Sequence, residues 1–171
     1  MSEFLTPLRL AAVIFLVAAG SIGGAWMFQT LGYAPCELCL KERIPYYVAM
    51  PLAALAAWLA GRSRPGLLAA CFAAIALIFA VGAALGVYHA GVEWRFWPGP
   101  SDCTGPLDHA SSVNDFLKQL QTVKVVRCDE VSLRVLGFSL AVWNAVISVG
   151  LTALAAMGLA LSLRRPEARG P

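Results

Sequence analysis

Four long stretches without a charged side chain constrain this sequence most. No Asp, Glu, Lys or Arg lies between Arg9 and Glu37, Arg43 and Arg62, Arg64 and Glu93, or Arg134 and Arg164. These stretches are 27, 18, 28 and 29 residues long, and roughly 20 apolar residues in a helix cross a bilayer core. They lack the alternation of apolar and polar residues that is typical of transmembrane β-strands. The sequence therefore predicts an all-α membrane protein, with a four-helix bundle formed by residues near 10–28, 44–60, 66–88 and 138–162.

The composition excludes the main alternatives to a membrane protein. Hydrophobic residues make up 59% of the 171 residues and charged residues only 13%, too few to cover the surface of a soluble domain. The same values exclude a disordered chain. A net charge of +3 without a basic run excludes a nucleic-acid-binding protein. Because no linker or sequence repeat divides the chain, we expect one membrane domain over residues 1–171.

Basic residues are distributed unevenly among the segments between the helices. The amino end, the link at 61–65 and the carboxyl end hold six Lys or Arg in 22 residues. The segments 29–43 and 93–134 hold seven in 57 residues, together with eight acidic residues. The positive-inside rule places the first set in the cytoplasm. We therefore expect two cytoplasmic termini and two outer loops, at about 29–43 and 89–137. Cleavage of the first helix as a signal peptide is an alternative that would leave this orientation unchanged.

The second outer loop holds two further patterns. An aromatic cluster at 93–100 is typical of the lipid–water boundary. Farther along, apolar residues at helical spacing predict a short helix: Val113, Phe116, Leu117 and Leu120. This helix would either lie flat on the membrane or pack against the top of the bundle.

Four of the five cysteines fall in the two outer loops. Cys36 and Cys39 lie in the first loop, and Cys103 and Cys128 lie in the second, on the side expected to be oxidising. Cys71 lies within the third predicted helix, where we expect it to pack as a small apolar residue. The four outer cysteines are therefore either two structural disulfides or redox-active pairs.

The first pair lies in a C-x-x-C motif that leads into the second helix. Sulfurs near a helix amino terminus are favoured as thiolates by the helix dipole, and so small a ring would constrain an unfolded chain little. Arg43 follows Cys39 by four residues, so the two share one helical face. Arg43 is then either a cation that supports electron transfer or an arginine snorkelling to the interface. The setting of this pair favours redox chemistry over a structural disulfide.

Other uses of a C-x-x-C motif fit the sequence less well. Haem attachment needs a histidine where Leu40 stands, and a thioredoxin-type motif needs an α/β context. Zinc would need four thiolates on an oxidising face, and 24 residues separate Cys103 from Cys128, which is not the spacing of a zinc knuckle. We therefore predict no metal site.

These motifs resemble those of the disulfide bond formation protein B (DsbB) family, the quinone reductases of the bacterial inner membrane. The resemblance covers essentially the whole chain and rests on the following residues: Pro35-Cys36-Glu37-Leu38-Cys39 with Arg43, Tyr88-His89, Trp97-Pro98-Gly99-Pro100 with Cys103, and Cys128 with Trp143-Asn144. The segment between Cys103 and Cys128 has a sequence of its own, so the details of partner docking do not carry over.

The resemblance implies a relay of disulfide exchange. The Cys103–Cys128 disulfide would oxidise the dithiol of a periplasmic thioredoxin-fold oxidase similar to DsbA, through a mixed disulfide at Cys103. Cys128 would then attack Cys36, and Cys39 would pass the electrons to ubiquinone or menaquinone. Arg43 would stabilise the negative charge that develops beside Cys39.

Some alternatives stay open at this point. His89, near the outer end of the third helix, would contact the quinone, relay a proton or cap the helix end. A vitamin K epoxide reductase-like protein would use a similar strategy, but its C-x-x-C lies at a later helix. The alternative from another class is a non-catalytic membrane protein whose outer cysteines form structural disulfides or bind a metal. The C-x-x-C before the second helix favours the DsbB-like function.

Overall fold

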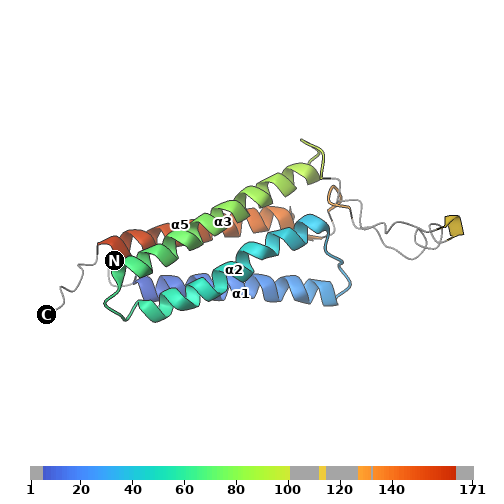
Figure 1. Cartoon of the computed structure of the whole chain (residues 1–171). Helices are drawn as coiled ribbons and strands as arrows, with labels where there is room; N and C mark the ends of the chain where they lie inside the picture. The colour runs from blue at the N-terminus through green and yellow to red at the C-terminus, as the bar shows by residue number, and fades with distance from the viewer. Residues whose placement is uncertain (1–5, 101–111, 115–126, 132, 165–171) are drawn as a thin grey trace.

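The computed structural model describes residues 6–100, 112–114, 127–131 and 133–164. Within these residues it contains four long helices and one small antiparallel sheet: α1 Pro7–Thr30, α2 Glu37–Leu59, α3 Pro65–Glu93, β1 Arg134–Val135, β2 Phe138–Ser139 and α5 Leu140–Leu163. The helices run alternately up and down in an elongated bundle (Figure 1). At one end of the bundle α1 and α3 finish while α2 and α5 begin. We call this the cysteine end, because it holds Cys36 and Cys39.

The second helix begins earlier than its apolar run suggested. It starts at Glu37, seven residues before the predicted start near 44. Cys36 is the residue that caps it, since its Sγ accepts the backbone N–H of Cys39 at 3.2 Å. The C-x-x-C motif therefore spans the first turn of α2, and Arg43 lies on the second turn. A charge-free run marks only the uncharged part of a helix, so it could not locate this start.

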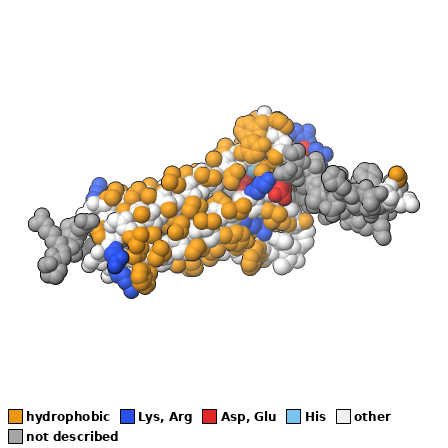
Figure 2. Space-filling view, in the orientation of Figure 1, with side chains coloured by type: hydrophobic (Ala, Val, Ile, Leu, Met, Phe, Trp, Pro, Cys, Tyr) orange, Lys and Arg blue, Asp and Glu red, His pale blue; other side chains and the backbone are white. Residues whose placement is uncertain are grey.

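Three of these helices are long and apolar enough to cross a membrane, namely α1, α3 and α5. Among the described helices α2 is the exception, because its first two turns carry Glu37, Lys41, Glu42 and Arg43. Figure 2 shows hydrophobic side chains over the visible flank of the bundle, with Lys and Arg toward its two ends. The structure thus confirms an all-helical bundle with three candidate spans, and the crossing of the membrane by α2 stays a prediction.

Small residues bring α3 and α5 close together. A Cβ atom added at Gly86 would lie 2.8 Å from the backbone nitrogen of Ala145, and one added at Gly158 would lie 2.4 Å from the ring of Phe72. Close approach of this kind stabilises membrane helices through van der Waals contacts. The hydrophobic effect does not drive helices together in a bilayer, because lipid tails are as apolar as the side chains. Glycines at these positions therefore permit the close α3–α5 contact, and a larger residue would force the Ala145 backbone or the Phe72 ring to shift.

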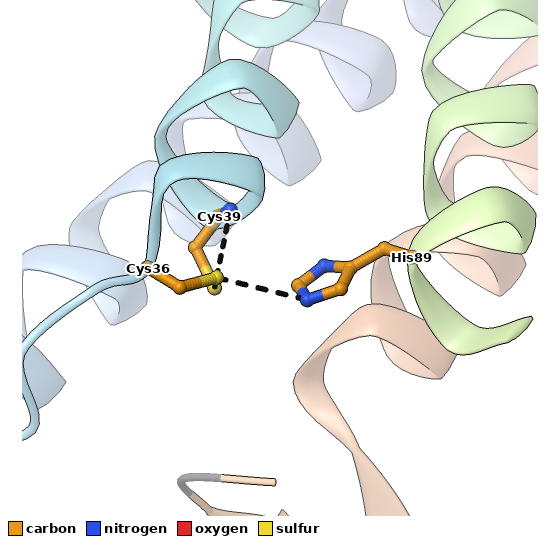
Figure 3. A group of neighbouring side chains, drawn as sticks. All are labelled: Cys36, Cys39 and His89. Atoms are coloured by element: carbon orange, nitrogen blue, oxygen red, sulfur yellow. Dashed lines mark hydrogen bonds between the residues drawn. The ribbon is translucent and has the colours of Figure 1, made fainter. Parts of the chain in front are cut away.

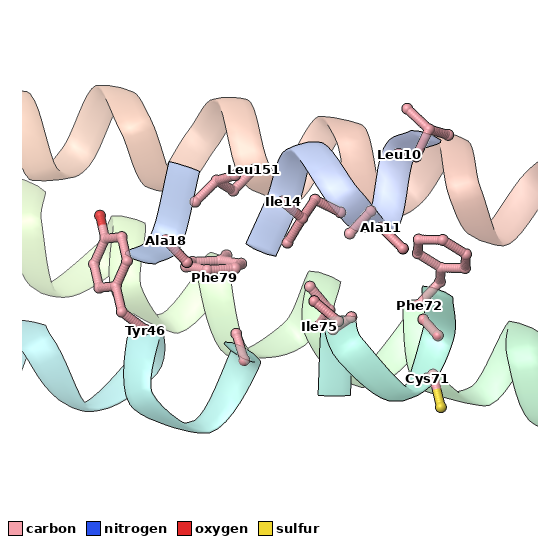
Figure 4. Close-up of a cluster of buried hydrophobic side chains, with 14 of the residues drawn as sticks. Leu10, Ala11, Ile14, Ala18, Tyr46, Cys71, Phe72, Ile75, Phe79 and Leu151 are labelled. Atoms are coloured by element: carbon pink, nitrogen blue, oxygen red, sulfur yellow. The ribbon is translucent and has the colours of Figure 1, made fainter. Parts of the chain in front are cut away.

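An apolar core fills the space between the helices. Fully buried side chains from all four helices contribute to it, for example Ile14, Ala53, Ile75 and Leu151 (Figure 4). Cys71 belongs to this cluster and is buried, which confirms it as a packing residue.

A short β-hairpin precedes α5, and the all-α prediction did not include it. Leu136 and Gly137, with φ of 52° and 88°, form the two-residue turn between the strands, as in type I′ hairpins. The indole Nε1 of Trp143 donates to the carbonyl of Val135 at 2.9 Å and holds the hairpin against α5. Leu-Gly is a weaker hairpin signal than Asn-Gly or Asp-Gly, so the sequence pattern did not reveal this turn.

Aromatic side chains gather at the end of α3, as the sequence predicted. Trp97 stacks on Tyr88 with ring centroids 6.0 Å apart, and its Nε1 donates to the Tyr88 carbonyl. Trp94 and Phe96 are more than half exposed, which suits the lipid–water boundary. The helix predicted near 113–120 lies largely outside the described residues, as does Cys103.

Candidate redox site

Cys36 and Cys39 form a dithiol at the start of α2. Both are free cysteines, and their sulfurs are 2.8 Å apart. Cys36 is only 4% exposed, whereas Cys39 is half-buried. His89 extends from the end of α3 toward the pair, and its Nε2 lies 3.6 Å from the Cys36 sulfur (Figure 3).

A buried carboxylate holds His89 in place. Glu42, on the second turn of α2, lies with Oε1 2.9 Å from His89 Nδ1. The two side chains are 9% and 3% exposed, so each satisfies a polar atom that burial would otherwise leave unpaired. The sequence analysis named His89 but missed Glu42. The sequence did offer a signal for Glu42, since it lies about one turn after the C-x-x-C at the start of a predicted membrane helix. Ionisable residues at membrane depth are rare and commonly functional.

This environment stabilises the thiolate of Cys36. A hydrogen bond from the Cys39 thiol is the largest cause that lowers the pKa of Cys36 from 9.0 to about 4. Burial opposes that shift, while His89 adds to it through its hydrogen bond and its charge, and the backbone N–H of Cys39 contributes further. The sequence predicted a stabilised thiolate in this pair, favoured at Cys39 by Arg43. The structure assigns it to Cys36 instead, with His89 as the neighbouring cation.

Cys128 approaches the same centre from the second loop. It is disulfide-bonded and 1% exposed. Cys128 forms one buried cluster with Cys36, Leu38 and Val92, against which Cys39 and Tyr88 pack. The structure therefore brings three of the four predicted cysteines together, and Cys103 lies outside the described residues.

A cavity of about 460 Å³ opens on the other side of the dithiol. Residues of α1, α2, the hairpin and α5 line it, including Phe28, Cys39, Val135 and Trp143. Most of its wall is apolar, and the charged groups that reach it are Glu42 and Arg43. The cavity is thus an apolar space inside the bundle, and one sulfur of the pair, that of Cys39, lines it.

Arg43 and His89 occupy different sides of the centre. Arg43 lines the cavity with Cys39, and its Nη1 donates to Gln29 Oε1 at 3.0 Å. In the described part of the chain its polar contact is thus with Gln29 rather than with a sulfur. His89 does not line the cavity and lies beside Cys36 instead.

The centre also has the composition of a metal site. One ligand atom each from Cys36, Cys39 and His89 lie within 4.8 Å of one another. Two thiolates bound at ~2.3 Å to a tetrahedral zinc ion would have their sulfurs about 3.8 Å apart. The observed 2.8 Å is much shorter, so this arrangement suits two sulfurs that share a proton or form a bond with each other.

Comparisons with known proteins agree with the chemistry of the site. The family model for disulfide bond formation protein DsbB matches residues 7–158. A disulfide bond formation protein B of Marinobacter nauticus is 33% identical over 164 residues, which cover 92% of each chain. A protein of the same description from Xanthomonas campestris is 32% identical over 80% of this chain and 81% of its own. One from Verminephrobacter eiseniae is 27% identical over 95% and 94%.

No solved structure matches the chain significantly. The family match covers most of the chain, and it includes the C-x-x-C, His89, Cys128 and Trp143-Asn144. The chain therefore belongs to the DsbB family and is a multi-pass protein of the bacterial inner membrane that takes part in disulfide bond formation.

Proposed function

We propose that this protein is a thiol–quinone oxidoreductase that reoxidises a periplasmic thioredoxin-fold oxidase similar to DsbA. One observation carries the proposal. The Cys36–Cys39 dithiol lies between a buried disulfide cysteine, Cys128, and an apolar cavity. A centre that passes electrons from a protein thiol to a membrane-soluble acceptor needs access on both of these sides.

Two successive exchanges account for the transfer on the protein side. A thiolate of the reduced partner attacks the Cys103–Cys128 disulfide at Cys103, and the partner leaves as a disulfide while Cys103 and Cys128 become thiols. Cys128 then attacks Cys36 of an oxidised Cys36–Cys39 pair, which releases Cys39. Closure of the Cys103–Cys128 bond leaves the inner pair as a dithiol. Each exchange forms one S–S bond and breaks one, as thiolate attack requires.

The cavity fits a quinone. Its apolar and aromatic walls suit the ring and its substituents, and Arg43 offers N–H donors beside Cys39. A guanidinium has five donors, and the bond to Gln29 uses one of them. A bound quinone supplies the final acceptor, taking two electrons and two protons to become a quinol. The acceptor is ubiquinone or menaquinone, since both have an apolar ring with carbonyl oxygens.

His89 and Glu42 offer a route for protons. Glu42 lines the cavity and contacts His89, which in turn contacts the Cys36 sulfur. The reduced pair keeps one proton, which the Cys39 thiol donates to the Cys36 thiolate, and hydrogen-bonding groups lead from Cys36 to the cavity. His89, protonated beside the thiolate, can release a proton toward Glu42 and take up another on the Cys36 side.

We also propose that α2 is the fourth span. It has 23 residues, about 34 Å of helix, and it packs between α1 and α3. Its charged residues lie in the first two turns, where they would stay near the outer surface. With both termini in the cytoplasm, the cysteine end would face the periplasm, which is the side where the partner oxidase acts.

Thiol trapping tests the proposal. The purified protein carries Cys71→Ala so that only the four relay cysteines are counted, and a mass-tagged alkylator labels its free thiols after denaturation. We expect four tags after reduction with dithiothreitol and removal of the reductant, and none once quinone is then added. Cysteines that do not react with quinone would keep their four tags, and that outcome would reject the relay.

A further inference from the structure

Asn144, on the second turn of α5, has one amide atom without a partner. Its Oδ1 accepts a hydrogen bond from the Tyr46 hydroxyl at 2.7 Å. Its Nδ2 is buried and has no hydrogen-bond partner among the described residues. Asn144 lines the same cavity as Cys39 and Arg43. Because burial of an unpaired amide donor is unfavourable, an acceptor inside the cavity would satisfy this group.

The structure places Asn144 Oδ1, and not Nδ2, at the Tyr46 hydroxyl. Tyr46 lies 2.7 Å from Asn144 Oδ1 and 3.3 Å from Ser148 Oγ. The phenol has a single proton to donate, and the shorter contact assigns it to the amide oxygen. Ser148 can then donate to the Tyr46 oxygen. In this arrangement the amide oxygen is occupied by Tyr46, and the N–H donor of Asn144 is left without a partner among the described residues.

The depth of this donor suits a quinone ring. Tyr46 follows Arg43 by three residues and Cys39 by seven, which is about 4.5 Å and about 10 Å of rise along α2. The Asn144 amide is bonded to Tyr46, so it lies about one turn deeper than Arg43. The two carbonyl oxygens of a quinone lie on opposite sides of its ring, a separation close to one helical turn of about 5.4 Å.

We infer that Asn144 Nδ2 donates a hydrogen bond to the inner carbonyl oxygen of the quinone, while the outer carbonyl faces Arg43 and Cys39. The inference rests on the proposed quinone reductase function. Asn144 is then a binding residue that sets the depth of the ring, and it acts on ubiquinone and menaquinone alike because both have the second carbonyl. The donor requires no charge, but because Nδ2 is buried in the bundle, the side chains beside it must shift for the quinone oxygen to reach it.

The test compares three variants of the full-length protein in detergent. Asn144→Leu removes the donor, and Asn144→Asp removes it while it keeps an acceptor for Tyr46. Thr152→Val is the matched control, because Thr152 lies on the same helix, bonds to the Ser148 carbonyl and does not line the cavity. The readouts are the rise in Tm on addition of decylubiquinone, which reports binding without turnover, and the KM for that quinone against kcat.

We expect KM to rise about three- to tenfold in Asn144→Leu and in Asn144→Asp at alkaline pH, with a smaller rise in Tm on quinone addition. Thr152→Val should match the wild type in both readouts. If the wild type responds to quinone and Asn144→Asp responds equally, the inference is wrong while the proposed function stands. If the wild type neither gains stability from quinone nor reduces it, the proposed function itself fails.

Discussion

The two ends of the bundle are built in different ways. Toward the opposite end, where α1 begins and α5 finishes, the helices meet through alanine, glycine and large apolar side chains, as at Gly158 and Phe72. At the cysteine end the buried groups include Glu42 and His89, and α1, α2 and α5 enclose a cavity instead of closing on each other. One half of the bundle is packed throughout, whereas the cysteine half keeps the tight α3–α5 contact at Gly86 and Ala145 but leaves a cavity among α1, α2 and α5.

The difference shows what the apolar core is for. Buried ionisable groups are unfavourable in an apolar bundle unless they are paired, and a cavity forgoes dispersion contacts. The tight α3–α5 packing offsets these losses and keeps His89 of α3 beside Cys36. We therefore expect substitutions in the packed half to change stability, and substitutions at the cysteine end to change reactivity.

The largest effect on stability is expected at Gly158. Gly158→Val places atoms against the buried ring of Phe72, and overpacking of this kind lowers the free energy of unfolding by about 1–3 kcal/mol. Gly150→Val on the same helix is the matched control, since a Cβ there meets nothing within 4 Å. Both variants carry the same change in helix propensity, so reversible unfolding in mixed micelles isolates the packing difference. The folded Gly158→Val protein should have the same KM for quinone as the wild type. A large change in KM would contradict the claim that the packed half affects stability and not reactivity.

The next effect is expected at Arg43, on quinone binding. Arg43→Met keeps the apolar stem but removes the donors and the charge beside the cavity. A charge-assisted hydrogen bond is worth on the order of 1.5–3 kcal/mol, so the affinity for quinone should fall about tenfold to a hundredfold. Arg62→Met is the control, because Arg62 lies over Trp58 at the opposite end. Equal quinone affinity in both variants would reduce Arg43 to an interfacial arginine that holds Gln29.

A smaller effect is expected on the pH dependence of Cys36. Because its pKa is lowered to about 4, Cys36 of the reduced protein is a thiolate at every pH above that value. Its rate of alkylation by iodoacetamide, followed by peptide mass spectrometry, should therefore stay flat on acidification until pH nears 4. His89→Gln removes a charge and a hydrogen bond that favour the thiolate, so the inflection should move about one unit higher. A wild-type inflection near that of an ordinary cysteine, about 8.5, would remove His89 from this role.

Some of this organisation was predictable from the sequence, and the reasons differ by residue. Charge-free runs revealed the helices because a bilayer excludes unpaired charge, and the C-x-x-C with its trailing Arg43 identified the centre. The pairing of Glu42 with His89 could not be predicted, because it joins two helices whose rotation about their axes is not fixed by an apolar pattern. The cavity was missed for a similar reason, since it depends on how α1, α2 and α5 meet. The Leu136-Gly137 turn was missed because Leu-Gly is a weak hairpin signal.

The central claim is that the two sulfurs of the dithiol have different partners: Cys36, buried in one cluster with Cys128, exchanges with that cysteine, and Cys39, which lines the cavity, reacts with quinone. Two variants in a Cys71→Ala, Cys103→Ala background test it most directly. One also carries Cys39→Ala and retains Cys36 with Cys128; the other carries Cys36→Ala and retains Cys39 with Cys128. After mild oxidation without quinone, disulfide mapping by mass spectrometry should find a high yield of the Cys36–Cys128 bond in the first and much less Cys39–Cys128 bond in the second. Equal yields, or a preference for Cys39, would contradict the account.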